Sequence, residues 1–526
     1  MSKMPSVMAH DFSRVPRAEI PRSSFDRSHG LKTAFDSGYL IPIFVDEALP
    51  GDTFNLNMTG FARLATPLHP FMDNVFMNTF FFAVPMRLIW ENWQKFMGEQ
   101  ANPNDSVDYL IPQIVSPAGG YATNSIFDYY GLPTLVPGLS SSCLPLRAYN
   151  LVWNEWFRDQ NLQNSVDVRT NDGPDSPDTY TLLRRGKRHD YFTSSLPWPQ
   201  KGPGVDIPLG TTAPVVGIGG GVGNAYTTPA PGTVLQTDNI AVTGLWNAAP
   251  SGIAIKGDNT TKVPEIYADL TQASAATINQ LRQAFQIQKL YERDARGGTR
   301  YTEIIRAHFN VVSPDARLQR PEYLGGGQSP INLYPIAQSS GTGGYTATPQ
   351  GSLAAYGTAG LHGHGFTKSF TEHCIIIGLV AVRADLNYQQ GLNKMWSRRT
   401  KFDFYWPALS HIGEQAVLNK EIYAQGTAED DLAWGYQERF AEYRYKPSVI
   451  TGEMRSNATQ SLDTWHLAQQ FATLPHLDAA FIEDNPPLQR VLAVLDEPQF
   501  IFDSYFKLRC ARPMPMYGVP GLIDHF

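Results

Sequence analysis

Charged residues are scarce in this chain. Of its 526 residues only 17% are Asp, Glu, Lys or Arg, against about 25% in typical soluble proteins. Helical bundles, coiled coils and charged disordered chains all need more of these residues, so the low charged fraction disfavours those classes. Glycine (44 residues), proline (39 residues) and aromatic residues (12%) are by contrast abundant. This composition favours strands joined by long turns.

Cysteine is almost absent, and long apolar runs are missing. The three cysteines, Cys143, Cys374 and Cys510, form no Cys-x-x-Cys pair of the kind used in zinc and redox sites. Residues 1–31 lack the apolar core of a signal peptide, and no stretch of about 18 apolar residues occurs. We therefore expect a soluble protein of a reducing compartment that is neither secreted nor inserted into a membrane.

The common catalytic motifs are also missing. The sequence contains no P-loop, no Gly-x-Ser-x-Gly nucleophile elbow and no His-Glu-x-x-His metal helix. Adjacent acids at 483–484 and 496–497 could act in a β-rich carbohydrate-active hydrolase, but neighbours in sequence do not establish the separation that acid and base catalysis needs. Solvated turns before Pro486 and Pro498 explain these acids more simply.

Two further candidates for chemistry are weak. His362 and His364 could present two imidazoles to a metal, but no third ligand is evident, so we interpret them as polar residues of a Gly-rich loop. Cys374 follows His373 but opens an apolar run, which predicts a buried structural thiol and not a nucleophile. The sequence therefore predicts no catalytic residue, no metal and no cofactor.

Hydrophobic periodicity predicts a mainly β fold. Residues 54–59 and 500–509 alternate apolar and polar side chains, as do strands that are buried on one face. The runs 75–84 and 374–382 are apolar almost throughout and predict strands buried on both faces. Helical spacing is confined to stretches at 89–97 and 152–157 and to a helix that begins near Thr277. The Gly-rich region 325–365 is expected to form a long loop.

Residues 200–263 differ from the rest of the chain. This segment holds 12 glycines, six prolines and only six charged residues. A flexible linker is one interpretation, and a compact β-rich insertion between two core strands is the other. Scattered β-branched residues and Trp246 favour the insertion.

Positive charge is concentrated in two places, although the whole chain has a net charge of −7. Residues 1–32 carry a net charge of +3 and three prolines, which predicts an extended basic arm. In the second place, basic residues alternate with aromatic ones; these are Arg383, Lys394, Arg398, Arg399 and Lys401 with Tyr388, Trp396, Phe402, Tyr405 and Trp406. Such a mixture suits single-stranded nucleic acid, because cations neutralise phosphates and rings stack on bases. Equally, Trp396 and Trp406 could be core anchors while the arginines pair with acids at a subunit contact.

Several long runs resemble one protein family. They are GFTKSFTEH (365–373), RADLNYQQGLNKMWSRR (383–399), FYWPAL (404–409), GEQAVLNKEIY (413–423), GYQERFAEYRYKP (435–447), SLDTWHL (461–467) and ARPMPMYGVPG (511–521), with FSRVP (12–16), GYLIP (38–42) and PLHPFMD (67–73) near the N-terminus. These runs closely resemble the major capsid protein of gokushoviruses, small tailless phages of the Microviridae with circular single-stranded DNA. The resemblance covers nearly the whole chain except 200–263.

The resemblance implies a structural protein with no catalytic step. Its fold would be an eight-stranded antiparallel jelly roll with large loop insertions and a few helices, and its subunits would self-assemble into a T=1 icosahedral shell around single-stranded DNA. By position, segment 200–263 would be the variable protrusion around the three-fold axis that contacts the host surface. Other implied partners are the DNA pilot protein, the small DNA-binding protein of the virion and a host-cell receptor. The protein would be found in the virion and, during assembly, in the host cytoplasm.

The expected organisation follows from both lines of reasoning. Residues 1–40 form a basic arm, 41–199 the first part of the jelly roll, 200–263 the surface insertion and 264–526 the second part with its long loops and tail. The candidate DNA contacts are Arg14, Arg17, Arg22 and Arg27 in the arm and Arg398, Arg399 and Lys401 in the basic and aromatic stretch.

Overall fold

The computed structural model describes residues 21–202, 215–216, 267–268, 278–315, 319–339 and 351–517. Two compact units make up the chain: residues 1–199 together with 297–526, and residues 200–296. In the second unit, strands β8 (Val215–Val216) and β9 (Tyr267–Ala268) pair antiparallel, and helix α5 spans Ile278–Gly297. The helix predicted to begin near Thr277 is confirmed, whereas most of segment 200–263 lies outside the described residues.

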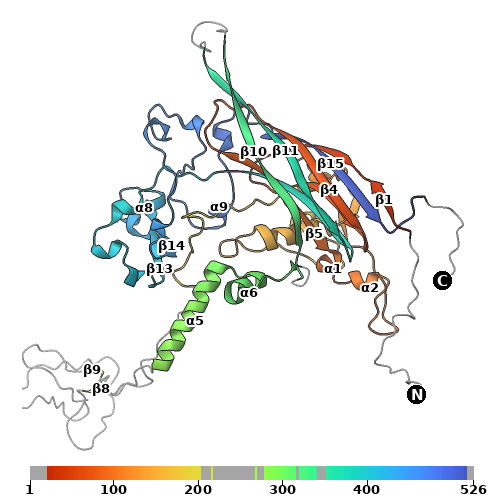
Figure 1. The fold of residues 1–526 in the computed structure, drawn as a ribbon, viewed down its shortest axis with the longest axis horizontal. Helices are drawn as coiled ribbons and strands as arrows, with labels where there is room; N and C mark the ends of the chain where they lie inside the picture. The colour runs from red at the N-terminus through yellow and green to blue at the C-terminus, as the bar shows by residue number, and fades with distance from the viewer. Residues whose placement is uncertain are drawn as a thin grey trace, which may run out of the picture. The chain divides into compact units, whose positions relative to one another are not determined.

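The first unit is built around an antiparallel sheet of nine strands (Figure 1). The strands are β1 (Ser23–Asp26), β2 (His29–Phe35), β3 (Ile41–Ala48), β4 (Thr53–Leu64), β5 (Val75–Pro85), β10 (Glu322–Ala337), β11 (Leu353–Ser369), β12 (Cys374–Ala384) and β15 (Phe500–Arg512). They pair in the order β1-β15-β4-β11-β10-β5-β12-β3, and β2 pairs with β15 beyond β1. Strands β1 and β2 therefore act as one interrupted edge strand, which leaves eight strand positions.

The strand order divides into two halves, β2-β15-β4-β11 and β10-β5-β12-β3. Following the chain, every connection from β2 onward passes from one half to the other except the connection from β5 to β10. This alternation is the double Greek key of a jelly roll. The two outer edges also approach each other, because Arg27 donates to both carboxylate oxygens of Asp46 in β3 and the ring of His29 stacks on Phe44 at 5.8 Å. The predicted eight-stranded antiparallel jelly roll is confirmed.

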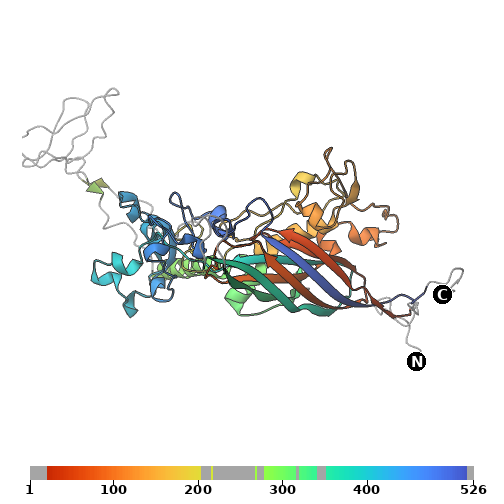
Figure 2. The ribbon, with the colours of Figure 1, turned by 90° about the horizontal axis from the view of Figure 1, so that it is seen from above.

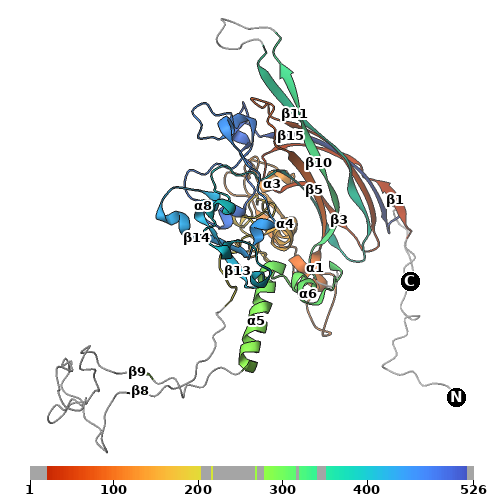
Figure 3. The ribbon, with the colours of Figure 1, turned by 60° about the vertical axis from the view of Figure 1, so that its left-hand side comes forward.

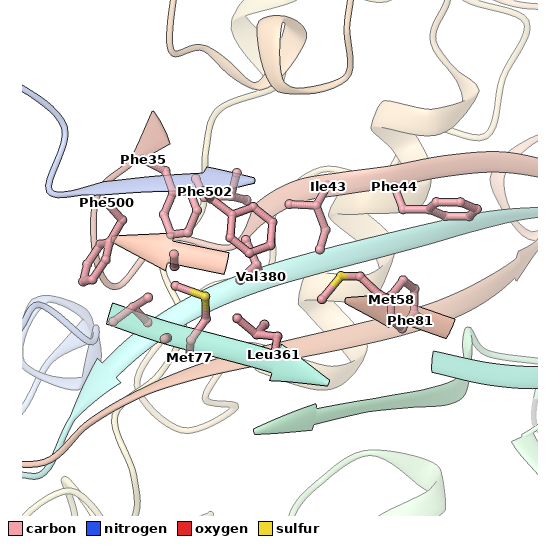
Figure 4. Packing of buried hydrophobic residues seen from close by; sticks show 14 of the residues in the cluster. Phe35, Ile43, Phe44, Met58, Met77, Phe81, Leu361, Val380, Phe500 and Phe502 are labelled. Atoms are coloured by element: carbon pink, nitrogen blue, oxygen red, sulfur yellow. The ribbon is translucent and has the colours of Figure 1, made fainter. Parts of the chain in front are cut away.

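The main hydrophobic core lies between the two halves. Strands β4 and β15 alternate buried and exposed side chains, so that Met58 and Phe502 point inward. From the opposite half, Met77 and Phe81 point toward them (Figure 4). The ring of Phe44 lies 6.2 Å from that of Phe81. The period-2 pattern in the sequence therefore identified the inward face of β4 and of β15.

A second core covers the other face of β5 and β12. It is formed by the insertion 86–199, whose elements are α1 (Met86–Ile89), α2 (Trp93–Phe96), β6 (Gln113–Val115), α3 (Ile126–Tyr129), β7 (Ser140–Ser142), α4 (Leu144–Val152), the π-helix η2 (Trp153–Phe157) and the 3-10 helix η3 (Pro177–Thr179). Phe82 and Ile377 of the strands pack there against Trp90 and Tyr149. Figure 2 shows this insertion on one side of the sheet. The prediction that β5 and β12 are buried on both faces is confirmed.

The helical stretch at 89–97 is interrupted. Helix α1 ends at Ile89 and α2 begins at Trp93, with Trp90 in an extended conformation between them. The side chains of Trp90 and Asn92 both donate to Asp172, at 2.7 and 3.0 Å, and these hydrogen bonds hold the break. A spacing of apolar residues cannot reveal such a partner 80 residues away.

The insertion 385–499 forms a third, small core at one end of the sheet together with Tyr191 and Phe192 (Figure 2). Its elements are η5 (Lys394–Ser397), η6 (Lys401–Asp403), η7 (Pro407–Leu409), β13 (Glu414–Leu418), α8 (Asn419–Ile422), η8 (Ala428–Asp431), β14 (Ala433–Glu438), η9 (Ala441–Tyr443), η10 (Gly452–Met454), η11 (Asp463–Trp465), α9 (Ala479–Ile482) and η12 (Leu488–Arg490). Phe192, Tyr388, Trp434 and Phe481 pack together there. Helix α6 (Tyr301–Phe309) precedes β10.

The expectation of a long loop at 325–365 is wrong. Most of this region belongs to the paired strands β10 and β11, and glycine is required because backbones approach closely there. A Cβ atom at Gly325 would lie 2.4 Å from the carbonyl oxygen of Gly365. His362 and His364 therefore lie on a strand and not in a loop. His364 is buried, with its Nδ1 2.8 Å from the Thr79 hydroxyl and its Nε2 3.2 Å from that of Ser329.

Candidate assembly and nucleic-acid surfaces

The basic and aromatic stretch folds into a series of tight turns. The Asn393 side chain accepts from the N–H of Met395 at 3.0 Å and starts η5. Asp403 accepts from the N–H groups of Thr400 and Arg399, at 2.7 and 2.9 Å, and these bonds hold the pKa of its carboxyl below the usual value. Short polar side chains thus fix the backbone, which leaves the larger side chains to point outward.

Five large rings of this stretch lie on the surface. We call them the aromatic surface; they are Trp396, Phe402, Phe404, Tyr405 and Trp406, with exposed fractions between 50% and 71%. The alternative that Trp396 and Trp406 are core anchors is wrong, because these side chains are 71% and 50% exposed. Exposed aromatic clusters of this kind mark interaction sites in soluble proteins.

The three basic candidates of this stretch differ in environment. Arg398 is largely buried: its guanidinium lies 4.4 Å from the ring centre of Tyr443 and 3.7 Å from the carboxylate of Glu442. Arg399 and Lys401 are exposed, and the Lys401 ammonium lies 5.1 Å from the ring centre of Phe402. The structure thus brings Lys401 to the aromatic surface, leaves Arg399 exposed, and places Arg398 within the fold, 5.3 Å from the ring centre of Phe404.

Of the four candidates in the basic arm, the structure describes two, and these two differ in environment. Arg14 and Arg17 lie outside the described residues. Arg22 is exposed and donates to the Thr53 hydroxyl at 2.7 Å. Arg27 makes a bidentate ion pair with Asp46, and this pair joins β3 to the turn between β1 and β2.

The densest basic run of the chain, Arg184 to His189, was missed by the sequence reasoning. Its backbone bridges residues 38–40 on one side and 482–484 on the other. The Arg184 guanidinium lies 3.9 Å from the ring centre of Tyr39, and the Lys187 ammonium lies 4.4 Å from that of Phe481. Five of its six residues are basic or titratable, and this density is the signal by which the sequence could have revealed the run. In the structure its cations contact other parts of the fold.

The carboxyl of Asp484 is surrounded by the cations of this run. The prediction of a solvated turn is wrong here, because the residue is only 3% exposed, whereas Asp496 and Glu497 are exposed as expected. Burial raises the pKa of Asp484 to about 6, and the surrounding Lys187 and Arg185 act in the opposite direction. Burial likewise lowers the pKa of Arg185 to about 10. Asp484 therefore interacts with cations that stabilise the fold, which is not the environment of a catalytic carboxyl that must reach a substrate.

No group of three or more His, Cys, Asp or Glu side chains within the described residues is placed to hold a metal ion. None of the helices in the described part of the chain is long and apolar enough to cross a membrane. Cys374 is buried as predicted, and burial raises the pKa of its thiol to about 12.

Jelly rolls with large loop insertions occur in viral shell subunits, which bury exposed aromatic surfaces against their neighbours. The comparisons agree: residues 13–522 match the family model described as capsid protein (F protein), and the chain belongs to this family. It is therefore a structural protein of the virion, a major capsid subunit that assembles with its own kind, and not an enzyme.

Three relatives are similar along their whole length. Capsid protein VP1 of Bdellovibrio phage phiMH2K is 49% identical over 531 residues, which cover 98% of both chains. Capsid protein VP1 of Chlamydia phage 1 is 46% identical over 595 residues, and that of Spiroplasma virus 4 is 37% identical over 550 residues, with 99% of both chains covered in each case. All three come from phages of the gokushovirus type, so the resemblance stated from the sequence is confirmed.

Proposed function

We propose that this capsid subunit builds a T=1 icosahedral shell around a circular single-stranded DNA genome. The observation that carries the genome contact is the aromatic surface with Lys401 beside Phe402 and with a second exposed cation, Arg399, in the same stretch of sequence. Ring faces stack on unpaired bases of any sequence, and neighbouring cations neutralise the phosphates. The hydrolase alternative has no support, since the relatives are named capsid proteins.

The DNA contacts within this proposal fall to the candidates that the structure shows as exposed and to the two arm residues outside the described part of the chain. Arg399 and Lys401 bind phosphates at the aromatic surface, and Arg14, Arg17 and Arg22 do so from the basic arm. Arg27 and Arg398 contribute indirectly, because their guanidinium groups are engaged by Asp46 and Glu442 and position the backbone around them.

The remaining partners follow from the same proposal. Segment 200–263 forms the three-fold protrusion that meets the host receptor, and its low charge leaves shape and hydrogen bonding to carry recognition. Inside the shell the subunit contacts the minor virion proteins, namely the DNA pilot protein and the small DNA-binding protein. Assembly takes place in the host cytoplasm.

Charge reversal tests the genome contact. Arg399→Glu/Lys401→Glu should leave the subunit folded and shell formation intact but lower the amount of packaged DNA, measured by the absorbance ratio at 260 and 280 nm of purified particles. A matched control is Lys95→Glu/Arg306→Glu, which reverses two exposed charges outside the stretch that carries the aromatic surface. Equal DNA content in both variants would contradict the proposed contact, and wild-type protein that forms no uniform spherical particles in negative stain would contradict the shell.

A further inference from the structure

One face of the sheet is uncovered. The strands β2, β15, β4 and β11 bury their inward side chains, and none of the described helices of the first unit lies on their outward side (Figures 1 and 3). The alternating positions that point outward are exposed; they are Asn55, Asn57, Thr59, Phe61 and Arg63 on β4 and Ile501, Asp503, Tyr505, Lys507 and Arg509 on β15. We call these ten residues the outer sheet face.

Two exposed aromatic residues occupy neighbouring positions on the outer sheet face. Tyr505 is 52% exposed and Phe61 is 55% exposed. In the register of the two strands Tyr505 lies opposite Thr59 and Phe61 opposite Asp503, so the rings occupy diagonal positions, which large side chains span. An exposed pair of this kind offers two adjacent stacking surfaces on a rigid sheet.

Glycines flank both rings. On the side away from the other ring, Tyr505 pairs with Gly30 of β2, and Phe61 pairs with Gly360 of β11. A residue without a Cβ atom covers no part of a neighbouring ring, so Tyr505 keeps an accessible face beside Gly30. Beside Phe61 the His362 imidazole approaches Gly360, with its Nε2 3.5 Å from where a Cβ atom would stand, and Phe61 remains 55% exposed. The glycines of β11, which composition alone assigned to a loop, therefore have a second consequence at this surface.

Positive charge surrounds the rings. Arg63, Lys507, Arg509 and Lys32 contribute four positive charges on this side of the sheet, against Asp503 and Asp26. Lys32 lies 3.2 Å from Asp503, whereas Asp26 is hydrogen-bonded to Ser28 beside Arg509. Asn55 and Asn57 add amide groups directly opposite Arg509 and Lys507. The face thus has a net charge of +2 in a chain whose net charge is −7.

We propose that the outer sheet face binds single-stranded DNA, with bases stacked on Tyr505 and Phe61 and phosphates held by Arg63, Lys507 and Arg509. Rings that stack on bases, together with cations that track the backbone, are what sequence-tolerant binding of single strands requires. The same face of a second copy is a poorer occupant, because two positively charged faces would repel each other. The inference rests on the proposed function, since it requires a single-stranded genome inside the shell.

The test uses the full-length wild-type chain and a fluorescent oligothymidylate, with binding followed by anisotropy. Phe61→Ala/Tyr505→Ala should weaken binding by about tenfold for each ring removed. An oligomer of abasic deoxyribose phosphates should bind wild type and this variant equally, because stacking no longer contributes. Phe61→Leu/Tyr505→Leu, which keeps apolar side chains on the strands but removes the rings, should lose the same preference for bases.

Two further variants separate the effects. Leu110→Ala, which removes an aliphatic side chain that is 86% exposed and lies outside this face, should bind as wild type does. Lys507→Gln/Arg509→Gln should lower the slope of log affinity against log salt by about 1.4, at about 0.7 per phosphate contact. Ring variants that bind the oligothymidylate as tightly as wild type would overturn the proposal. So would ring variants that bind DNA normally but no longer form particles, since the face would then be a subunit interface.

Failure of this inference is distinguishable from failure of the proposed function. If wild type forms particles and binds DNA while only Arg399→Glu/Lys401→Glu loses binding, the outer sheet face is overturned and the proposed function stands. If wild type forms no particles, the proposed function fails first.

Discussion

Arg147 and Asp175 form a bidentate ion pair in which neither side chain has any exposed surface. Arg147 donates from Nε and Nη2 to the two carboxylate oxygens, at 2.8 and 2.7 Å. Its third nitrogen, Nη1, donates to the carbonyl oxygens of Ile89 and Asn171, and Tyr180 donates to Asp175 at 2.5 Å. This network ties α4 to the end of α1 and to the loop before η3, so it fixes the helical layer that covers β5 and β12.

Removing one partner of this ion pair should be costly. Burial acts to raise the pKa of Asp175, but hydrogen bonds from Arg147 and Tyr180 outweigh it and lower the pKa. Arg147→Met would leave the carboxylate buried without its countercharge, and we expect a loss of about 3–5 kcal/mol in the free energy of unfolding. Urea unfolding of the unassembled subunit measures it. The control Arg169→Met removes an exposed pair with Asp167 and should cost no more than about 1 kcal/mol; equal losses would contradict the prediction.

Gly365 should tolerate no side chain. A Cβ atom at this position would lie 2.0 Å from the carbonyl oxygen of Leu56 in the paired strand β4. We expect Gly365→Ala to force the strands apart and to lower the free energy of unfolding by about 3 kcal/mol. Gly119→Ala is the control, because a Cβ atom there meets nothing within 4 Å. Thermal melting of both variants checks the prediction, which a wild-type melting temperature for Gly365→Ala would refute.

His364 should make the barrel sensitive to mild acid. Burial lowers its pKa, and the neighbouring His362 lowers it further. In the unfolded chain the imidazole has a pKa of about 6.5, so as pH falls below that value the unfolded state binds a proton that the folded state resists. Stability is therefore fully present above about pH 6.5 and declines as pH falls toward the depressed pKa of the folded protein.

Comparison of variants isolates this effect. His364→Gln should flatten the fall in melting temperature between pH 7 and pH 5, whereas His362→Gln, at an exposed position of the same strand, should keep most of it. If wild type and His364→Gln lose stability in parallel over this range, the buried imidazole is not the titrating group.

Much of the fold could be predicted from residue pattern. Alternation in 54–59 and 500–509 identified β4 and β15, and apolar runs identified β5 and β12, because burial on one or two faces leaves a direct record in side-chain polarity. Strands β10 and β11 left no such record. Their glycines are selected by backbone contacts such as Gly326 against Thr79, where a Cβ atom would lie 2.0 Å from the carbonyl oxygen.

The candidate surfaces were less predictable for a related reason. An aromatic residue has the same identity in a core and on a surface, so the sequence could not decide whether Trp396 was an anchor or an exposed ring. The same holds for the arginines: Arg27 and Arg398 have acidic partners at distant positions, Asp46 and Glu442, which only the fold brings near.

Substitutions at the neighbours Arg398 and Arg399 should have different effects, the first on the stability of the subunit and the second on DNA binding. Arg398→Gln would remove the cation from the Tyr443 ring and leave the buried Glu442 without its countercharge, so we expect a loss of about 1–3 kcal/mol in the free energy of unfolding. Arg399→Gln should leave stability within about 0.5 kcal/mol of wild type and lower the salt slope of oligonucleotide binding by about 0.7. Urea unfolding and anisotropy on the same preparations measure both quantities. An exposed side chain that binds phosphate adds little to the stability of the free subunit, but its charge contributes fully to DNA binding. If Arg399→Gln therefore unfolds at lower urea than wild type, or keeps the full salt slope, the assignment of Arg399 as a phosphate contact is wrong.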